Sequence, residues 1–117
     1  AFTRGHLFVS FCISLDDLVD DLKLESSSIY FTYILKMILE EFGSKCWIKW
    51  PNDFYIDDKK IGGMVSNIVD NFLVCGIGLN LQSSPSLEYS KLDIKLDREV
   101  LLNKYFELIE KKILWKQ

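Results

Sequence analysis

The sequence predicts an α+β domain, in which a mixed, mostly antiparallel sheet is covered by helices. Three observations support this fold class. Short segments with alternating apolar residues follow one another closely between residues 47 and 81. Turn-forming pairs, Asp57-Asp58 and Asp70-Asn71, separate the later segments. Stretches with apolar residues three and four positions apart flank this meander and predict helices.

The first strand is expected at residues 7–14, where every second residue is apolar. Because the other face carries Phe8 and Cys12, we expect a central strand that is covered on both sides. Residues 15–25 are rich in carboxylates and are expected to form a solvated loop or a short helical turn, with an acidic metal cluster as the alternative. These carboxylates are Asp16, Asp17, Asp20, Asp21 and Glu25.

A helix is expected after Ser26-Ser27-Ser28, whose hydroxyls suit an N-cap, and Gly43 should end it. Its apolar residues recur with the spacing of a helix face that packs on a sheet. We expect this core-facing stripe to consist of Tyr30, Tyr33, Ile34, Met37, Ile38 and Phe42.

Four strands are expected in the meander, at residues 47–50, 54–56, 60–69 and 72–81. The first of them should stop at Pro51, which has no amide hydrogen to continue a ladder. A loop is expected at residues 83–86, and a second helix should begin after Asp97 as its N-cap. The core-facing residues of that helix are expected to be Leu101, Leu102, Tyr105, Leu108, Ile109 and Ile113.

The composition narrows the function classes. At 117 residues the chain is one small domain, or part of one, and 49% hydrophobic residues suffice for a packed core. A net charge of -3 gives no electrostatic footprint for nucleic acid. The longest apolar runs are too short to span a membrane, and no export leader is recognisable. Three cysteines, Cys12, Cys46 and Cys75, are expected to be reduced and buried in a cytoplasmic protein.

Four glycines in two neighbouring expected strands point to a binding site: Gly62, Gly63, Gly76 and Gly78. Glycine weakens a strand, so its presence suggests that something approaches the backbone closely. Since side chains alternate in a strand, Gly76, Gly78 and Asn80 share one face and would form a floor for a flat ligand. Tight packing or a bulge is the alternative. A Rossmann site is disfavoured, because these glycines do not open a helix.

Lys60 is the best candidate for a working residue, because its ammonium could hold a carboxylate or a phosphate as a point charge. The alternative is a surface lysine in the turn at residues 57–60. A regular hairpin with a two-residue turn would leave Lys60 on the side of the sheet opposite to Asn80. We therefore expect a longer turn or a strand bulge, with Gly62-Gly63 as its candidate position, that brings Lys60 onto the glycine face.

Three motifs together resemble the biotin protein ligases (biotin–[acetyl-CoA-carboxylase] ligases). They are Lys49-Trp50-Pro51-Asn52-Asp53, Lys60-Ile61-Gly62-Gly63-Met64 and Gly76-Ile77-Gly78-Leu79-Asn80-Leu81. They occur in the order and roughly the spacing of the family. The resemblance covers Gly5 to Leu81 and implies the incomplete catalytic domain of a class II synthetase-like ligase. It implies ATP and Mg²⁺ as cofactors, biotin as substrate, and a biotin carboxyl carrier protein as partner.

The resemblance also implies roles for single residues. Lys60 would bridge the carboxylate of biotin and the α-phosphate of ATP. Asn52 and Asp53 would lie on the nucleotide side, with Asp53 as a metal ligand. The remaining residues of the implied substrate and nucleotide site are Lys49, Trp50, Gly62, Gly63, Gly76, Gly78 and Asn80.

Several features of the family are not recognised in this sequence. The Gly/Arg-rich loop that folds over biotin and a Ser/Thr segment that contacts its ring have no match, and Arg4 does not replace the loop's arginines. A DNA-binding domain and a C-terminal barrel are also absent. We therefore expect a single partial domain over residues 1–117, a fragment or a truncated relative. A non-catalytic binding module and a lipoate ligase stay open as alternatives, and a homodimer through sheet edges is possible.

Overall fold

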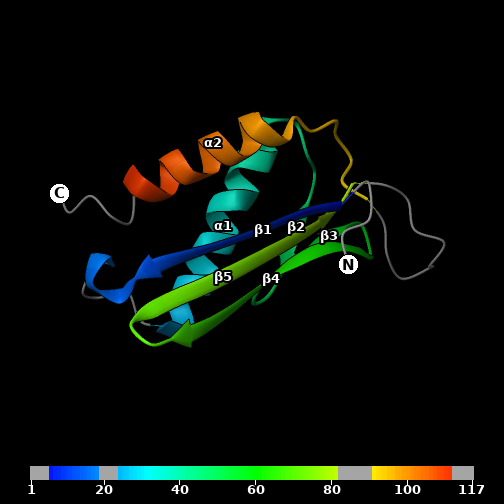
Figure 1. Cartoon of the computed structure of the whole chain (residues 1–117). Helices are drawn as coiled ribbons and strands as arrows, with labels where there is room; N and C mark the ends of the chain where they lie inside the picture. The colour runs from blue at the N-terminus through cyan, green and yellow to red at the C-terminus, as the bar shows by residue number, and fades with distance from the viewer. Residues whose placement is uncertain (1–5, 19–23, 82–90, 112–117) are drawn as a thin grey trace.

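The computed structural model describes residues 6–18, 24–81 and 91–111. They form one five-stranded sheet and two α-helices, with a short 3-10 helix after the first strand (Figure 1). The elements are β1 (His6–Ser14), η1 (Leu15–Asp17), α1 (Leu24–Glu41), β2 (Trp47–Lys49), β3 (Asp53–Ile56), β4 (Lys59–Val69), β5 (Phe72–Asn80) and α2 (Arg98–Ile109).

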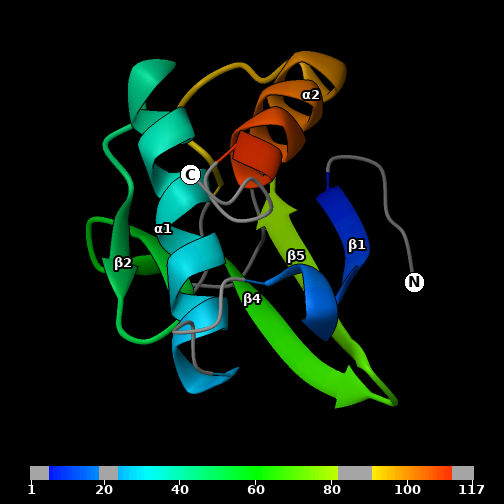
Figure 2. The ribbon, with the colours of Figure 1, turned by 90° about the vertical axis from the view of Figure 1, so that its left-hand side faces the viewer.

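The strand order is β1-β5-β4-β3-β2, and every strand pair of the described part is antiparallel. The α+β fold is therefore confirmed, and each strand of the meander lies within one residue of its expected bounds. Figures 1 and 2 show α1 and α2 on the same side of the sheet. We call the other side of the sheet the open face.

The alternation in β5 explains this arrangement. Its core face carries Leu73, Cys75, Ile77 and Leu79, each at most 2% exposed, while the residues between them are half-buried. The expectation that the first strand is central and covered on both sides is wrong. In the described part of the chain β1 lies at an edge of the sheet, and Phe8 on its open face is 57% exposed.

Two details of the first helix also differ from the expectation. α1 begins at Leu24, so Ser26-Ser27-Ser28 lies inside the helix, where Ser27 is fully buried, and is not its N-cap. The expected stripe is rotated, because α1 packs against both the sheet and α2. Of the expected residues, only Ile34 and Ile38 are buried, whereas Tyr30, Tyr33, Met37 and Phe42 are exposed; the other buried apolar residues are Phe31, Leu35 and Leu39.

The ends of the helices follow their local chemistry. Gly43 has a φ of +99°, which favours glycine and ends α1 as expected. The carboxylate of Asp97 accepts a hydrogen bond from the Val100 amide and caps α2. Leu101, Tyr105 and Ile109 of α2 are buried. The expected loop at residues 83–86 lies outside the described residues, as do Arg4, Asp20, Asp21 and Ile113.

The cysteines are free thiols. Cys46 and Cys75 are buried as expected, and burial raises the pKa of Cys75 to about 11, so its thiol is protonated at neutral pH. The expectation is wrong for Cys12, which is exposed because β1 has an open face. In the part of the chain that the structure describes, no helix is long and apolar enough to cross a membrane.

Asp93 fastens the segment after β5 to the chain between α1 and β2. Its carboxylate accepts hydrogen bonds from Ser44 Oγ at 2.6 Å and from the Lys45 amide at 2.8 Å. The same segment is held to the end of β5, since the Leu92 amide donates to the Asn80 carbonyl at 2.8 Å. These contacts fix the start of the segment that leads to β2.

We expect Asp93→Asn to lower stability in a pH-dependent way. Partial burial raises the pKa of Asp93, but the hydrogen bonds from Ser44 and Lys45 outweigh it, so its pKa is lowered. The carboxylate therefore stabilises the fold above its ordinary pKa of about 3.9, and this stability is lost as pH falls through the lowered folded value. Because Asp93 is exposed, the difference in urea midpoint between wild type and variant should be modest at pH 7, and it should shrink as the pH falls below about 3.9. Asp58→Asn, in an exposed turn, is the control.

Candidate active site

The turn between β4 and β5 has two residues, Asp70 and Asn71, and the pairing beyond it is regular. Asp70 adopts a φ of +53°, a conformation that Asp tolerates in tight hairpin turns. A longer turn is therefore not the source of the shift that the sequence requires. With regular alternation along β4, Lys60 would point away from Gly76 and Gly78.

A bulge in β4 reverses this placement. Phe54 pairs with Gly62 but Tyr55 pairs with Lys60, so Ile61 is an extra residue in the β3–β4 ladder. Ile61 and Phe54 are both fully buried on the core face. Because of the bulge, two consecutive residues of β4, Ile61 and Gly62, face the core. The predicted bulge is thus present, one residue earlier than expected, and it turns Lys60 to the open face.

One residue from each strand lies in a single row across the open face. The register pairs Lys49 with Asp53, Asp53 with Gly63, Gly63 with Gly78, and Gly78 with Phe8. Neighbouring strands are about 4.8 Å apart, so the row spans the whole sheet. Its centre consists of two glycines, and the row is therefore bare backbone between Asp53 and Phe8.

A cavity of about 500 Å³ lies over this bare region. Gly63, Gly76 and Gly78 line it, and we call these three residues the glycine floor. Asp53 and Lys60 provide the charged groups of the lining, and Phe8 provides an aromatic ring. The full lining comprises Phe8, Ser10, Asn52, Asp53, Lys60, Gly63, Met64, Val65, Gly76, Ile77 and Gly78.

Lys60 and Asp53 form an ion pair at the charged end of the floor. Lys60 Nζ is 3.2 Å from Asp53 Oδ1, and both side chains are about one-third exposed, at 36% and 33%. A Cβ atom at Gly63 would lie 2.9 Å from Asp53 Oδ1 and 3.7 Å from Lys60 Cε. The pair therefore occupies the space directly beside Gly63, and an anion on the floor can reach the ammonium from the solvent side.

Asn52 holds the turn that carries Asp53. Its side-chain amide donates to the Met64 carbonyl at 2.6 Å, and its own carbonyl accepts from the Met64 amide at 2.9 Å. Two hydrogen bonds to one residue fix the turn across β4. The resemblance assigns Asn52 to the nucleotide side. In the structure Asn52 lies in the cavity lining, and its side-chain nitrogen already donates to the Met64 carbonyl.

Asn52→Ala should weaken both stability and any activity of the site. It leaves the buried Met64 carbonyl without the Asn52 donor, which costs about 1–3 kcal/mol, and it frees the turn that sets Asp53 against Lys60. Urea unfolding and an activity assay at saturating substrate measure the two effects. Asn103→Ala, at an exposed position of α2, should change neither stability nor activity. An unchanged urea midpoint for Asn52→Ala would contradict the role of its hydrogen bonds to Met64 in holding the turn.

Four of the candidate residues are not in the cavity lining. Lys49 lies over the ring of Tyr55, with Nζ 5.3 Å from its centroid, and Trp50 is 71% exposed. Asn80 is on the open-face side of β5, but the cavity ends before it. Gly62 faces the core, where a Cβ atom would lie 2.1 Å from the Gly78 carbonyl oxygen. Gly62 is thus required for packing within the sheet.

The described residues do not fit a metal ion held by the protein. Asp53 is the single carboxylate of the cavity lining, and it is paired with Lys60. No group of three His, Cys, Asp or Glu residues in the described ranges could hold a metal. Mg²⁺ is commonly bound by one or two carboxylates together with substrate phosphates. The role of Asp53 as a metal ligand therefore stays a prediction.

Sequence reasoning missed Phe8, Ser10 and Val65. They come from β1 and β4 and reach the cavity through cross-strand pairing, since Ser10 pairs with Gly76 and Gly76 with Val65. The signal available in the sequence was the apolar Phe8 on the less apolar face of its strand. That signal was interpreted as the second buried face of a central strand.

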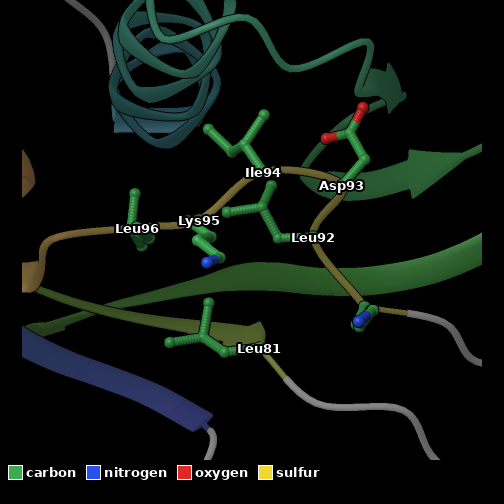
Figure 3. A pocket seen from close by; sticks show the side chains of 7 residues that line it. Leu81, Leu92, Asp93, Ile94, Lys95 and Leu96 are labelled. Atoms are coloured by element: carbon green, nitrogen blue, oxygen red, sulfur yellow. The ribbon is translucent and has the colours of Figure 1, made fainter.

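A second cavity, also of about 500 Å³, lies between Leu81 and residues 91–96 (Figure 3). Leu92, Ile94 and Leu96 contribute apolar side chains. The carboxylate of Asp93 points away from Leu81 in this view, and it is used by Ser44 and Lys45. This cavity has no ion pair and no glycine floor among its lining residues, and we assign it no role.

Comparison with known proteins agrees with this geometry. The model of the biotin/lipoate A/B protein ligase family matches residues 2–81. A biotin acetyl coenzyme A carboxylase synthetase from Helicobacter pylori, solved with biotinylated ATP bound, is 34% identical, with a TM-score of 0.83 over 97% of this chain and 53% of that one. The biotin protein ligase from Aquifex aeolicus, in complex with biotin and ATP, is 25% identical, with a TM-score of 0.71 over 92% and 49%.

A structure of an archaeal lipoylation system from Thermoplasma acidophilum, with a bi-partite lipoate protein ligase, matches at 14% identity and a TM-score of 0.64. At this identity the likeness concerns the fold alone. The chain spans about half the length of the proteins that it matches. Since the family model covers more than half of the chain, and a relative aligned over nearly all of it shares a third of its residues, the chain belongs to the biotin/lipoate A/B protein ligase family.

Proposed function

We propose that this chain carries the catalytic centre of an ATP-dependent biotin–protein ligase. In the first step a carboxylate oxygen of biotin attacks the α-phosphorus of ATP. The bond between that phosphorus and the pyrophosphate oxygen breaks, which gives biotinyl-5'-AMP and pyrophosphate. This chain supplies the sheet and its open face to that activity.

The observation that carries the proposal is the Lys60–Asp53 ion pair at one end of the glycine floor. Adenylation brings two anions together, a carboxylate and a phosphate, and a fixed ammonium beside them reduces their repulsion. Asp53 orients the lysine, and the floor lets a flat ligand lie against the peptide groups. Mg²⁺ would enter as the counter-ion of ATP, and no step of this mechanism is assigned to it.

In the second step the adenylate would acylate a protein. The amine of an acceptor lysine attacks the acyl carbon, an amide bond forms, and AMP leaves together with one proton. We propose the lysine of a biotin carboxyl carrier domain as acceptor, because the 34% identical relative is named as a synthetase for acetyl coenzyme A carboxylase. The three free cysteines suit a reducing, cytoplasmic setting.

Pyrophosphate exchange into ATP tests the first step directly. The full-length protein should catalyse this exchange when biotin is added, and titration calorimetry should show biotin binding that ATP and Mg²⁺ strengthen. Exchange that depends on lipoate and not on biotin would replace biotin by lipoate as the substrate. Binding of biotin without exchange would support a binding module, and no binding of either acid would exclude both ligase assignments.

Lipoate is the second candidate, because the matching family includes lipoate ligases. Both acids have a ring and a flexible carboxylate chain, so the floor and Lys60 suit either one. The higher identity and the bound biotin compounds of the relatives favour biotin.

A further inference from the structure

The glycine floor has two different ends along the transverse row. At one end are the carboxylate of Asp53 and the ammonium of Lys60, which are 3.2 Å apart. At the other end is the ring of Phe8, on the neighbouring strand β1. Only Gly63 and Gly78 separate these ends within the row. A ligand that lies along the row therefore meets a cation at one end and an aromatic ring at the other.

The ring of Phe8 leans over the floor. If Gly78 carried a Cβ atom, three ring atoms of Phe8 would lie within 3.5–4.0 Å of it, which is ordinary van der Waals contact. At Gly76, by contrast, a Cβ atom would meet Val65 Cγ2 at 3.4 Å and no ring atom of Phe8. The side chain of Phe8 is thus the group that ends the bare backbone along the row, and Val65 bounds it sideways.

Phe8 is also placed where it can touch a ligand. The residue is 57% exposed although it lines the cavity, so its ring is not embedded in the core. An aromatic ring offers a flat apolar face to a ring system that approaches along the floor. The backbone positions of Asp53, the partner of Lys60, and of Phe8 are three strand spacings apart in the sheet, which fixes where the two ends of the floor begin.

We propose that Phe8 is a specificity-determining residue that sets the length of the acid accepted by this site. When the carboxylate of the acid is held at Lys60, its ring end contacts Phe8. An acid with a longer or shorter carboxylate chain cannot make both contacts at the same time. This inference rests on the proposed function for the direction in which the acid lies. It concerns the size of the substrate, whereas the ion pair concerns its reactive end.

The test compares biotin with its homologues that have one methylene more or one methylene less in the carboxylate chain. Their dissociation constants are measured by calorimetry on the full-length protein, for wild type, Phe8→Ala and Phe8→Trp. Truncation of the ring should raise the affinity for the longer homologue relative to biotin at least tenfold. Enlargement should shift the preference toward the shorter one. Val69→Ala, which removes exposed apolar surface of β4 outside the cavity lining, should leave the preference unchanged.

Each affinity ratio compares two acids measured on the same protein preparation. A partial loss of folded protein affects both measurements equally and does not change their ratio. If Phe8→Ala changes the affinities for all three acids by the same factor, Phe8 does not set the length and the inference is overturned. Because binding is measured without ATP, the outcome does not depend on catalysis. Absent pyrophosphate exchange in wild type, with a normal shift of preference in Phe8→Ala, would reject the proposed enzyme while keeping Phe8 as a determinant of ligand length.

Discussion

Lys60→Ala is expected to reduce biotin-dependent pyrophosphate exchange by about 10²–10³-fold, the loss that follows removal of one preorganised charge-stabilising group. The ammonium is the cation of the cavity lining, so no other lining residue of the described part replaces it. Protein stability should hardly change, because a partly exposed ion pair contributes about 0–1 kcal/mol. Loss of activity without loss of fold is the expected signature.

Two further variants sharpen this experiment. Lys59→Ala removes an exposed lysine next to Lys60 in the chain and should keep full exchange activity. Lys60→Arg keeps the charge but replaces a compact ammonium by a planar fork, and it should restore activity only in part. Exchange by Lys60→Ala within about threefold of wild type would remove Lys60 from the mechanism, provided that the protein remains folded by circular dichroism.

Gly62→Ala is expected to destabilise the fold by about 1–3 kcal/mol or more, the range for forcing an extra methyl group into a packed core. Its Cβ atom would lie 2.1 Å from the Gly78 carbonyl oxygen and 3.0 Å from Leu79 Cα. Both are backbone atoms of β5, so no side chain can rotate away. The β4–β5 ladder must separate locally, and a lower urea midpoint measures the loss.

Gly76→Ala is the matched control, because it places the same methyl group on the open face of the neighbouring strand. The new atom meets only Val65 Cγ2, at 3.4 Å. Stability should stay within about 0.5 kcal/mol of wild type, as for most substitutions away from the core. Biotin affinity should fall, since the methyl group stands on the glycine floor.

Equal urea midpoints for Gly62→Ala and wild type would contradict the prediction for Gly62 and would show that the bulge can relax.

The pair Gly62→Ala and Gly76→Ala separates two kinds of glycine that the sequence treats alike. Gly62 and Gly63 are adjacent and both belong to a motif that resembles the ligase family. The bulge at Ile61 directs the first toward Leu79 and the second toward Asp53. A sequence pattern identifies that glycine is needed at both positions. Whether the reason is packing or ligand access depends on which face each one occupies.

Much of the fold could be predicted from the sequence because it depends on local chemistry. Turn pairs such as Asp57-Asp58 and Asp70-Asn71 tolerate positive φ, and here Asp57 and Asp70 adopt values of 52° and 53°. Gly43 and Asp97 end and begin helices through their own backbone or side chain. The strand bounds follow from alternation within a few residues. The α+β class and the motifs of the candidate site are therefore local properties.

Other features required the tertiary structure, since they depend on which segments become neighbours. The stripe of α1 was mispredicted because α1 packs against α2 as well as the sheet, so that Phe31 and Leu35, which spacing alone did not select, are buried. Phe8 was mistaken for a core residue because its position at an edge of the sheet is set by the strand order. The sequence left a longer turn and a bulge near Gly62-Gly63 as alternatives, and the pairing of β3 with β4 decided for a bulge, at Ile61. The sequence by itself determined the residue types and the local elements, whereas long-range pairing decided which of those residues face one cavity.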